Sequence, residues 1–364
     1  MDILHEDDAV IALNKPAGIR VVPSPANSAT SQRPTATKTD SVIERVLAHY
    51  KALGDSFLIP ETLRSLPAAS DGMATPDGRE PLELGSGEPM EGQLTLGQDA
   101  VVHRLDQGTS GVLLLAKTAD AASSLRQQFR ERRVKKIYFA VTQGMLKGPM
   151  TVTSCIGRDP NDRRKMQSAR QIWGVHGAAT RVATSGKLRG AVTLLKPLLF
   201  NGKWSVVQAS PVTGRTHQIR LHLQMLKTPL IGDPLYGDAS ATSAFLASAV
   251  ALRSGCSRGP LGVLGQHGAP GMALPGRRGH IRPLLHAAEV CFIHPRTAES
   301  LLVRAPLPPD MRGAIAVVDP HWPTAPELSP FAGDSRDPSF KAAFLEKLHH
   351  LGEVGKGEVP FASA

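Results

Sequence analysis

The feature that most constrains the fold is a pair of apolar stretches joined by Asn201-Gly202. Val192–Leu199 and Trp204–Ala209 lie on either side of this dipeptide. Asn-Gly is the pair of residues best suited to the tight turn of a β-hairpin, because both positions tolerate a positive φ. The two strands of a hairpin run antiparallel. The sequence therefore predicts an antiparallel sheet.

Other segments extend this prediction along the chain. Ile3–Leu13 resembles two strands joined by a turn at His5–Asp8, and Gly111–Lys117 is an apolar strand candidate. Thr118 is suited to cap a helix over Ala119–Arg132. The remaining expected elements are a strand over Ile137–Gln143 and helices near Ser41–Leu53 and Thr216–Leu226. Strands in hairpins with helices between them indicate an α+β fold with a mostly antiparallel sheet and flanking helices.

Charge and cysteine content narrow the class of protein. Lys and Arg number 42 against 32 Asp and Glu, which gives a net charge of +10 and favours a polyanionic partner. The three cysteines, Cys155, Cys256 and Cys291, are widely spaced and form no metal-type pair, which fits a reducing compartment. No apolar run is long enough to span a bilayer. A soluble, basic protein is expected.

Two regions differ in composition from the rest. Residues 71–99 carry seven acidic residues and one basic residue among repeated Gly and Pro. Residues 239–288 contain no acidic residue and are rich in Gly and Pro, which favours a flexible insertion over a folded subdomain. Near the end of the chain, Ser339–His350 is expected to form a short helix.

The first candidate for chemistry is the polar loop His103–Gly111, which leads directly into the apolar strand. A loop with this support can hold a reactive side chain rigidly, and Asp106 is the reactive residue in it. The alternative is an Asp that only satisfies nearby backbone donors in a turn. A single motif of this kind does not decide between the two.

The second candidate is the segment Arg126–Tyr138, which holds six cations and one anion in thirteen positions. A run of this kind is usually a solvated helix face. Here there are too few acidic residues to pair with the cations, which favours a surface that faces phosphates. Tyr138 is either a core ring or a surface on which a base stacks.

The third candidate comprises Gly214–Leu223 and the following Pro229–Gly237. The two histidines of the first segment, His217 and His222, are five residues apart with no Glu between them, so they do not form the zinc pair of a metalloprotease. Arg220 lies between two apolar residues. A buried Arg in such a place can keep a nearby carboxylate ionised and oriented.

Taken together, these segments resemble the RluA family of pseudouridine synthases. The matching segments, in chain order, are Ile3–Asp8 with Asn14–Gly18, His103–Asp106 with Thr109–Gly111, Lys136-x-Tyr138, Gly214–Arg220 with Gly232-Asp233 and Tyr236-Gly237, and finally Leu285–Ala287, His294-Pro295 and Ala305–Pro308. The nucleophilic Asp of the family falls on Asp106. One motif alone would be weak, but several in the right order are specific.

The resemblance implies a domain organisation. Residues 1–310 are expected to form the pseudouridine synthase catalytic domain around a central RNA-binding cleft, with insertions at 54–99 and 239–282. Residues 311–364 are expected to be a partly flexible C-terminal extension. Relatives often begin with an S4-type RNA-binding domain, and this chain is expected to be the form that lacks it.

The resemblance also implies a reaction: a uridine already in RNA is isomerised by breaking its N1–C1′ bond and joining C5 to C1′. Asp106 is then the catalytic carboxylate, Tyr138 packs on the base, and Arg220 pairs with Asp106. Whether Asp106 attacks C1′, adds to the base or removes the 2′ proton stays open. The residues expected to bind substrate are His103, Arg104, Thr109, Lys136, Arg215, His217 and Gln218.

Partners and cofactors follow from the same reaction. We expect a stem-loop of ribosomal or transfer RNA as substrate, no DNA, no membrane, no cofactor and no metal, and a monomer in the cytoplasm or in an organelle matrix. Two alternatives stay open. One is an inert RNA-binding or ribosome-assembly protein on the same scaffold. The other is a retaining glycosidase, which needs a second carboxylate about 5 Å from the first.

Overall fold

The structure, a computed structural model, describes residues 1–23, 41–52, 98–169, 188–255 and 282–320. The described strands are β1 (Asp2–Glu6), β2 (Val10–Lys15), β3 (Ser110–Ala116), β4 (Lys135–Gln143), β5 (Met150–Arg158), β6 (Met166–Ala169), β7 (Arg189–Phe200), β8 (Trp204–Pro211), β9 (Leu285–Ile293) and β10 (Ser300–Arg304). The helices are α1 (Val42–Ala52), α2 (Ala119–Arg130), α3 (Gln218–Met225), α4 (Ala239–Gly255) and α5 (Pro309–Val318), with a short 3₁₀ helix η3 (Gln98–Ala100).

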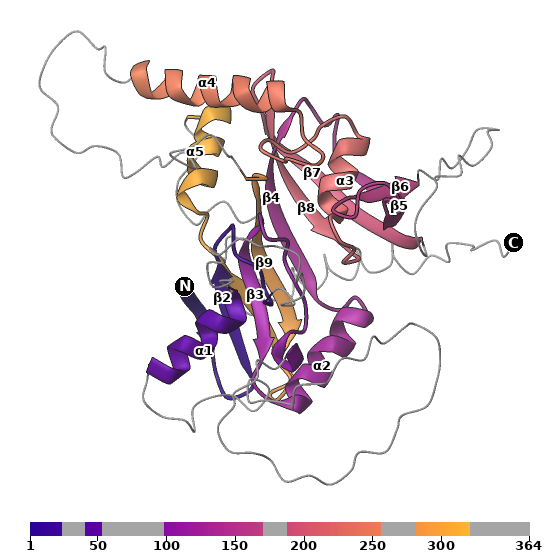
Figure 1. The fold of residues 1–364 in the computed structure, drawn as a ribbon, viewed down its shortest axis with the longest axis vertical. Helices are drawn as coiled ribbons and strands as arrows, with labels where there is room; N and C mark the ends of the chain where they lie inside the picture. Colours follow the sequence, from indigo (N-terminus) through magenta and orange to yellow (C-terminus); the bar gives the residue numbers. More distant parts are fainter. Residues whose placement is uncertain (24–40, 53–97, 170–187, 256–281, 321–364) are drawn as a thin grey trace, which may run out of the picture.

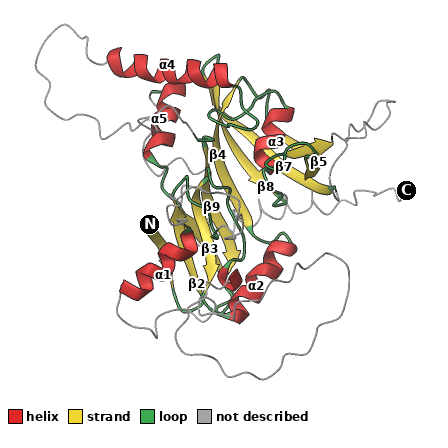
Figure 2. Cartoon of the chain, viewed as in Figure 1, coloured by secondary structure: helices red, strands yellow, loops and turns green. Residues whose placement is uncertain are grey.

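Within the described ranges, the ten strands form one sheet in the order β1-β2-β3-β9-β4-β8-β7-β5-β6, with β10 paired to β9. All described strand pairs are antiparallel except β3 with β9. The expected hairpin at Asn201-Gly202 joins β7 to β8. Helices flank the sheet along its length (Figures 1 and 2). The predicted α+β class with a mostly antiparallel sheet is confirmed.

One half of the sheet, around β2 and β3, is covered on both faces. Side chains of a strand alternate between its two faces, and both strands are apolar on each. One set of alternate residues packs against α1 and the other against α2; the first set is Ile11, Leu13, Leu113 and Leu115, and the second is Val10, Ala12, Val112 and Leu114. This explains why β3 is buried at every position. The strand that follows the Asp106 loop is therefore rigid.

The other half of the sheet, around β4, β8 and β7, is also covered on both faces. Ile219 and Leu223 of α3 pack on one face, against Leu195 and Val207 among others. On the opposite face α4 and α5 pack against β4 and β8, with side chains that include Phe245, Met311, Ile315, Phe139 and Trp204. Helix α3 is thus fixed on the sheet by its apolar side, and its first turn reaches the loop that precedes β3.

Gly111 allows β3 and β9 to approach closely at the point where the Asp106 loop ends. Its φ is +114°, and a Cβ there would lie 2.1 Å from the carbonyl oxygen of Ala287. A non-glycine residue would be strained at this φ and would also clash. Gly111 therefore allows the end of the Asp106 loop to lie directly against β9.

The prediction of a flexible insertion over 239–288 is wrong for the part of it that the structure describes. Residues 239–255 form helix α4, and β9 begins at Leu285. Ala241, Phe245 and Ala249 recur at a spacing of four and are buried. The average composition of the region hid this apolar helix face. Residues 256–281 lie outside the described ranges.

The C-terminal boundary expected at residue 310 falls inside α5. Met311, Ala314 and Ile315 of this helix are buried in the core beside β4 and β8. Most of the insertion expected at 54–99, and the helix expected near Ser339–His350, lie outside the described residues. None of the described helices is long and apolar enough to cross a membrane.

Candidate active site

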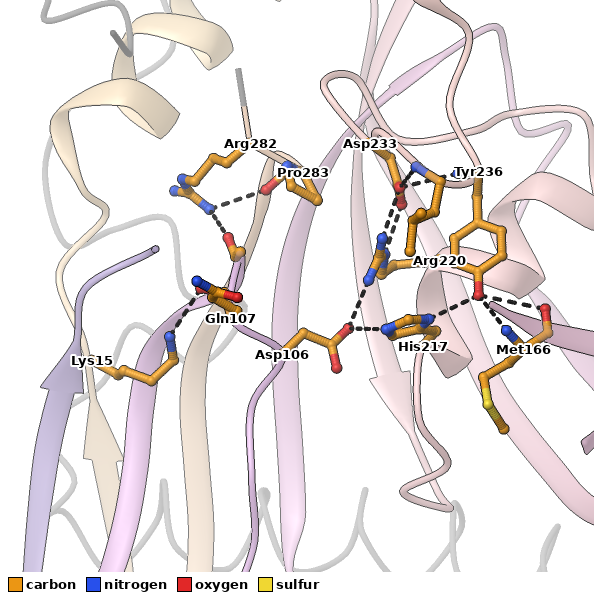
Figure 3. A network of polar contacts seen from close by, with 12 residues as sticks. Lys15, Asp106, Gln107, Met166, His217, Arg220, Asp233, Tyr236, Arg282 and Pro283 are labelled. Carbon is orange, nitrogen blue, oxygen red and sulfur yellow. Dashed lines mark hydrogen bonds and ion pairs between the residues drawn. The ribbon is translucent and has the colours of Figure 1, made fainter. Parts of the chain in front are cut away.

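Asp106 lies in the loop before β3, and three groups hold the backbone of this loop. The amide of Gly18 donates to the carbonyl of Gln107 over 2.7 Å, and Lys15 Nζ donates to the same carbonyl over 3.3 Å. On the other side, Arg282 Nη1 donates to the carbonyl of Gly108 over 3.1 Å. Figure 3 shows Lys15 and Arg282 beside the loop at Gln107. The reactive side chain therefore projects from a backbone that is fixed on both sides.

Lys15 is a fully buried cation whose role the sequence did not predict. Its ammonium group also donates to the carbonyls of Pro16 and Ile19, over 3.0 and 2.9 Å. Burial, together with the nearby charge of Arg282, lowers the pKa of Lys15 to about 8. The Asn-Lys-Pro-Ala-Gly motif had marked Lys15 as a residue of the family. The motif did not indicate that Lys15 holds a loop about ninety positions away in the sequence.

Arg282 is the second cation that holds the Asp106 loop, and the sequence did not predict this role either. Its Nε and Nη2 donate to Asp310 of α5 over 2.6 and 3.0 Å, and its Nη1 donates to the carbonyls of Pro283 and Leu285 as well as Gly108. The Asp106 loop is thus fastened to α5 through one guanidinium. Residue 282 lies at the end of the expected insertion 239–282, where nothing in the sequence marked it.

The carboxylate of Asp106 forms an ion pair with Arg220 of α3. Arg220 Nη1 lies 3.2 Å from Asp106 Oδ2, while its Nε and Nη2 lie 2.7 and 2.8 Å from the two oxygens of Asp233. The Asp106 side chain is 25% exposed, whereas that of Asp233 is only 1% exposed. One guanidinium therefore joins an accessible carboxylate to a buried one.

The surroundings of Arg220 keep it charged. Burial by itself would lower the pKa of Arg220, but the hydrogen bonds and charge of Asp233, with a contribution from Asp106, raise it above its ordinary value. Asp233 is held in turn, because its Oδ1 accepts from the amides of Leu235 and Tyr236. Arg220 is therefore a permanent cation beside Asp106, and Asp233 does not offer the cleft a second free carboxylate.

His217 approaches Asp106 from another direction. It precedes α3 with a left-handed backbone, and its Nε2 lies 3.9 Å from Asp106 Oδ2. Its Nδ1 lies 2.8 Å from the hydroxyl of Tyr236. Tyr236 is a site residue whose side-chain role the sequence did not predict, although the Tyr-Gly pair was recognised as a motif.

Tyr138 and Lys136 enter the site from the start of β4. Tyr138 packs against two core clusters and also lines the cleft, so it is in part the core ring considered from the sequence, while the stacking of a base on it stays a prediction. Burial and then the charge of Asp106 raise the pKa of Tyr138 above its ordinary value, which keeps its hydroxyl protonated. Burial and the neighbouring Lys135 lower the pKa of Lys136 to about 8.

Two residues expected to bind substrate have other contacts. The amide of Gln218 uses all of its hydrogen-bonding capacity within the protein: it donates to Val192 and Thr193 and accepts from Thr213 and Arg215. These bonds fix the segment before α3; Gln218 also lines the cleft, and its contact with substrate stays a prediction. Spacing could not distinguish this use of Gln218 from substrate binding.

His103 is the other residue with a different use. Its Nε2 accepts a hydrogen bond from the amide of Leu114 over 2.9 Å, and its ring stacks on Phe129 with a centroid distance of 4.8 Å. Burial, with the charge of Lys136, lowers the pKa of His103 to about 3, so it is a neutral acceptor. His103 thus fastens the start of the loop to β3, although its ring also borders the cleft.

Asp106 lies where two open hollows of the surface meet. One, of about 820 Å³, is lined by Tyr138 and by the basic residues Arg104, Arg126, Arg130, Arg132, Lys136 and Arg215. The other, of about 1220 Å³, is lined by basic residues that include Arg20, Arg104, Arg163 and Arg164. Thr109 is buried beside Asp106, and its amide donates to the Asp106 carbonyl over 3.0 Å. The arrangement suits a polyanion that passes over Asp106 with phosphates on both sides.

Within the described residues, no group of three or more His, Cys, Asp or Glu side chains is placed to hold a metal ion. The chemistry available at Asp106 is that of an accessible carboxylate beside a fixed cation, with an aromatic ring and a neutral imidazole facing the same space.

Comparison with known proteins gives a consistent result. The sequence pattern of a family described as RNA pseudouridylate synthase matches residues 92–225. A protein of Neisseria meningitidis serogroup A named ribosomal large subunit pseudouridine synthase D is 31% identical over 318 residues, which is 87% of this chain and 61% of that protein. A rice protein named RNA pseudouridine synthase 2, chloroplastic, is 29% identical over 85% of this chain and 62% of its own length.

A solved structure shares the fold. Human RNA pseudouridylate synthase domain containing 4 superposes with a TM-score of 0.53 at 21% identity, over 87% of this chain and 92% of that one. The chain spans only about 61% of the length of the Neisseria relative.

Proposed function

Since this chain belongs to the RNA pseudouridylate synthases, and within them to the RluA family, we propose that it converts specific uridines of structured RNA into pseudouridine. The observation that carries the proposal is the Asp106 carboxylate, which is accessible in a cationic cleft and ion-paired to a buried Arg220. Ribosomal RNA is the proposed substrate class, because the Neisseria relative is named for the large ribosomal subunit.

In the proposed mechanism, the target uridine leaves its stack and enters the cleft at Asp106. The N1–C1′ bond breaks, the uracil rotates, and C5 joins C1′; the proton on C5 is lost and N1 gains one, so no atoms or electrons are exchanged with a co-reactant. As the nucleophile, Asp106 forms a bond to C1′ while the N1–C1′ bond breaks, and this bond breaks again when C5 joins C1′. Arg220 is paired with Asp106 and orients its carboxylate, and Tyr138 packs on the base while the base is detached.

The two alternatives have less support. A retaining glycosidase needs a second accessible carboxylate, and Asp233, the candidate for it, is shielded by Arg220 with 1% of its side chain exposed. An inert RNA-binding protein would not require a carboxylate poised in this way. The direct test is to map pseudouridines in cellular RNA with and without the gene; an unchanged map would contradict the proposal.

We further propose that phosphates of the RNA lie along Arg130 and Arg132. Both residues line the cleft, whereas their neighbour Arg133 is paired with Glu131 at 2.6 Å and does not. Each lost phosphate contact should reduce the log–log slope of RNA affinity against salt by about 0.7 for single strands. An Arg130→Ser/Arg132→Asn variant should therefore have a slope lower by about 1.4. Asn is chosen because residue 132 has a φ of 60°.

Arg133→Ser is the matched control for this salt titration. It removes one charge from the same segment but no cleft contact, so its slope should equal that of the parent. Equal slopes for all three proteins would indicate that the segment is a solvated surface and would move the phosphate path elsewhere.

For Tyr138 we propose that the ring, and not the hydroxyl, holds the base. Tyr138→Phe should bind RNA within about twofold of the parent, while Tyr138→Ala should bind about tenfold or more weakly, the usual effect of losing one stacked base. Binding is measured with a fluorescent RNA, and thermal unfolding shows whether Ala disturbs the core. A loss of turnover in Phe at unchanged binding would assign a chemical role to the hydroxyl instead.

A further inference from the structure

His217 lies between two groups that constrain its protons. Figure 3 shows the imidazole between Asp106 and Tyr236, with Met166 beyond the tyrosine hydroxyl. Nε2 lies 3.9 Å from Asp106 Oδ2, and Nδ1 lies 2.8 Å from the Tyr236 hydroxyl. The rings of His217 and Tyr236 meet edge to face at a centroid distance of 5.5 Å. The imidazole side chain is only 15% exposed.

The contacts of Tyr236 decide which nitrogen of His217 carries the proton. The Met166 amide donates to the Tyr236 oxygen over 2.8 Å, so that oxygen already accepts one hydrogen bond. The single hydroxyl proton has two acceptors to choose from, His217 Nδ1 at 2.8 Å and the Met166 carbonyl at 3.4 Å. The shorter contact is the stronger one. Nδ1 is therefore an acceptor, and in the neutral ring Nε2 carries the hydrogen.

The charge of Asp106 favours the same tautomer. With the proton on Nδ1, a lone pair of Nε2 would face the carboxylate and repel it. With the proton on Nε2, an N–H dipole points towards the carboxylate from a side different from that of Arg220. Two independent contacts, one on each nitrogen, thus select the same state of the ring.

We propose that His217 is a positioning residue for Asp106, which presents Nε2–H to the carboxylate and is held in this tautomer by Tyr236. The proposal rests on the proposed function and goes beyond it, because it assigns roles to His217 and Tyr236 in the same site. At 3.9 Å the Nε2–H group is beyond hydrogen-bond distance, so His217 acts on Asp106 through its N–H dipole, which favours the carboxylate from a second side without adding a charge. In this state Nε2 has no lone pair and cannot act as a base.

The charged groups around His217 are consistent with a neutral ring. Burial lowers the pKa of His217; Asp106 and Asp233 raise it, and Arg220 and Arg104 lower it. The hydrogen bond that Tyr236 donates to Nδ1 also stabilises the neutral form. Removing that hydroxyl should therefore raise the pKa of His217 and allow the proton of the neutral ring to lie on either nitrogen.

The test is a ¹⁵N NMR titration of the full-length chain, with the signals of His217 assigned by their loss in His217→Gln. We expect Nε2 to resonate as the protonated nitrogen and Nδ1 as the unprotonated one near neutral pH. In Tyr236→Phe the two signals should move towards each other, and the titration should shift to higher pH. A parent spectrum with the proton on Nδ1 would overturn the proposal, without any need for the variant to fold.

Turnover of RNA gives the second readout. The amide nitrogen of Gln can take the place of Nε2–H, whereas Asn reaches only as far as Nδ1. His217→Gln should therefore keep turnover within about tenfold of the parent. In His217→Asn, kcat should fall by about tenfold or more while KM changes little, because the N–H dipole that faces the carboxylate is lost. Equal turnover in both variants would overturn the positioning role. A parent chain that forms no pseudouridine would overturn the proposed function, while the NMR result would still decide the tautomer.

Discussion

The Asp106→Asn variant is expected to fold as the parent chain does and to form pseudouridine at least about a thousandfold more slowly, the order of loss seen when a catalytic group is removed. The amide has almost the same volume as the carboxylate, but it has no charge and no nucleophilic oxygen. The fold should survive because Asp106 is partly exposed and Arg220 keeps both of its hydrogen bonds to Asp233. Single-turnover kinetics with excess enzyme would measure the loss.

A matched control separates the loss of chemistry from a general loss of charge. Asp120 is an exposed carboxylate in the first turn of α2 and does not line the cleft. Asp120→Asn should retain full turnover. Turnover of Asp106→Asn above about a tenth of the parent rate would remove Asp106 from the role of nucleophile, because an uncharged amide could not support it.

The largest expected effect on stability comes from Arg220. Arg220→Met should lower the free energy of unfolding by about 3–5 kcal/mol, since it leaves the buried carboxylate of Asp233 without a counter-charge. The side chain of Asp233 is 1% exposed and cannot turn to solvent to escape this cost. Urea unfolding followed by circular dichroism measures the change.

A double variant tests the cause. Arg220→Met/Asp233→Asn removes the stranded charge but keeps an oxygen that can accept from the amides of Leu235 and Tyr236, so most of the stability should return. Its turnover should stay low, because Asp106 still lacks its cation. Arg164→Met, which breaks an exposed ion pair with Asp162, should leave the unfolding midpoint unchanged. A single Arg220→Met variant as stable as Arg164→Met would contradict the explanation.

The elements that could be predicted are those formed by residues near each other along the chain. The hairpin at Asn201-Gly202 and the helix capped by Thr118 depend on contacts within a few positions, and the buried strand after the Asp106 loop is marked by its uninterrupted apolar run. The apolar face of α4 has equally local causes, but it was missed because the composition of 239–288 was judged as a whole. Strands β5, β6, β9 and β10 were not predicted; β6 and β10 are each paired at only one side, whereas β5 lies between β7 and β6.

The chemical nature of the site could be predicted, but the use of its side chains could not. The motif order pointed to Asp106, Tyr138 and Arg220, and all three border one cleft. His103 and Gln218 are polar like these residues, yet both form hydrogen bonds with the backbone of the protein. A sequence indicates which donors and acceptors exist, and only packing decides which partners reach them.

The sequence by itself determined the fold class, the family and the carboxylate that carries the proposed reaction, because local hydrogen bonding and motif order are written along the chain. Only the tertiary structure decided how that carboxylate is held. Arg220 lies 114 positions from Asp106, and Arg282 lies 174 positions from Gly108. Contacts at such separations depend on how the sheet and helices pack, since a buried cation binds whichever oxygen the fold brings to it. The position of the proton on His217 likewise depends on its contact with Tyr236, which the tertiary structure brings beside it.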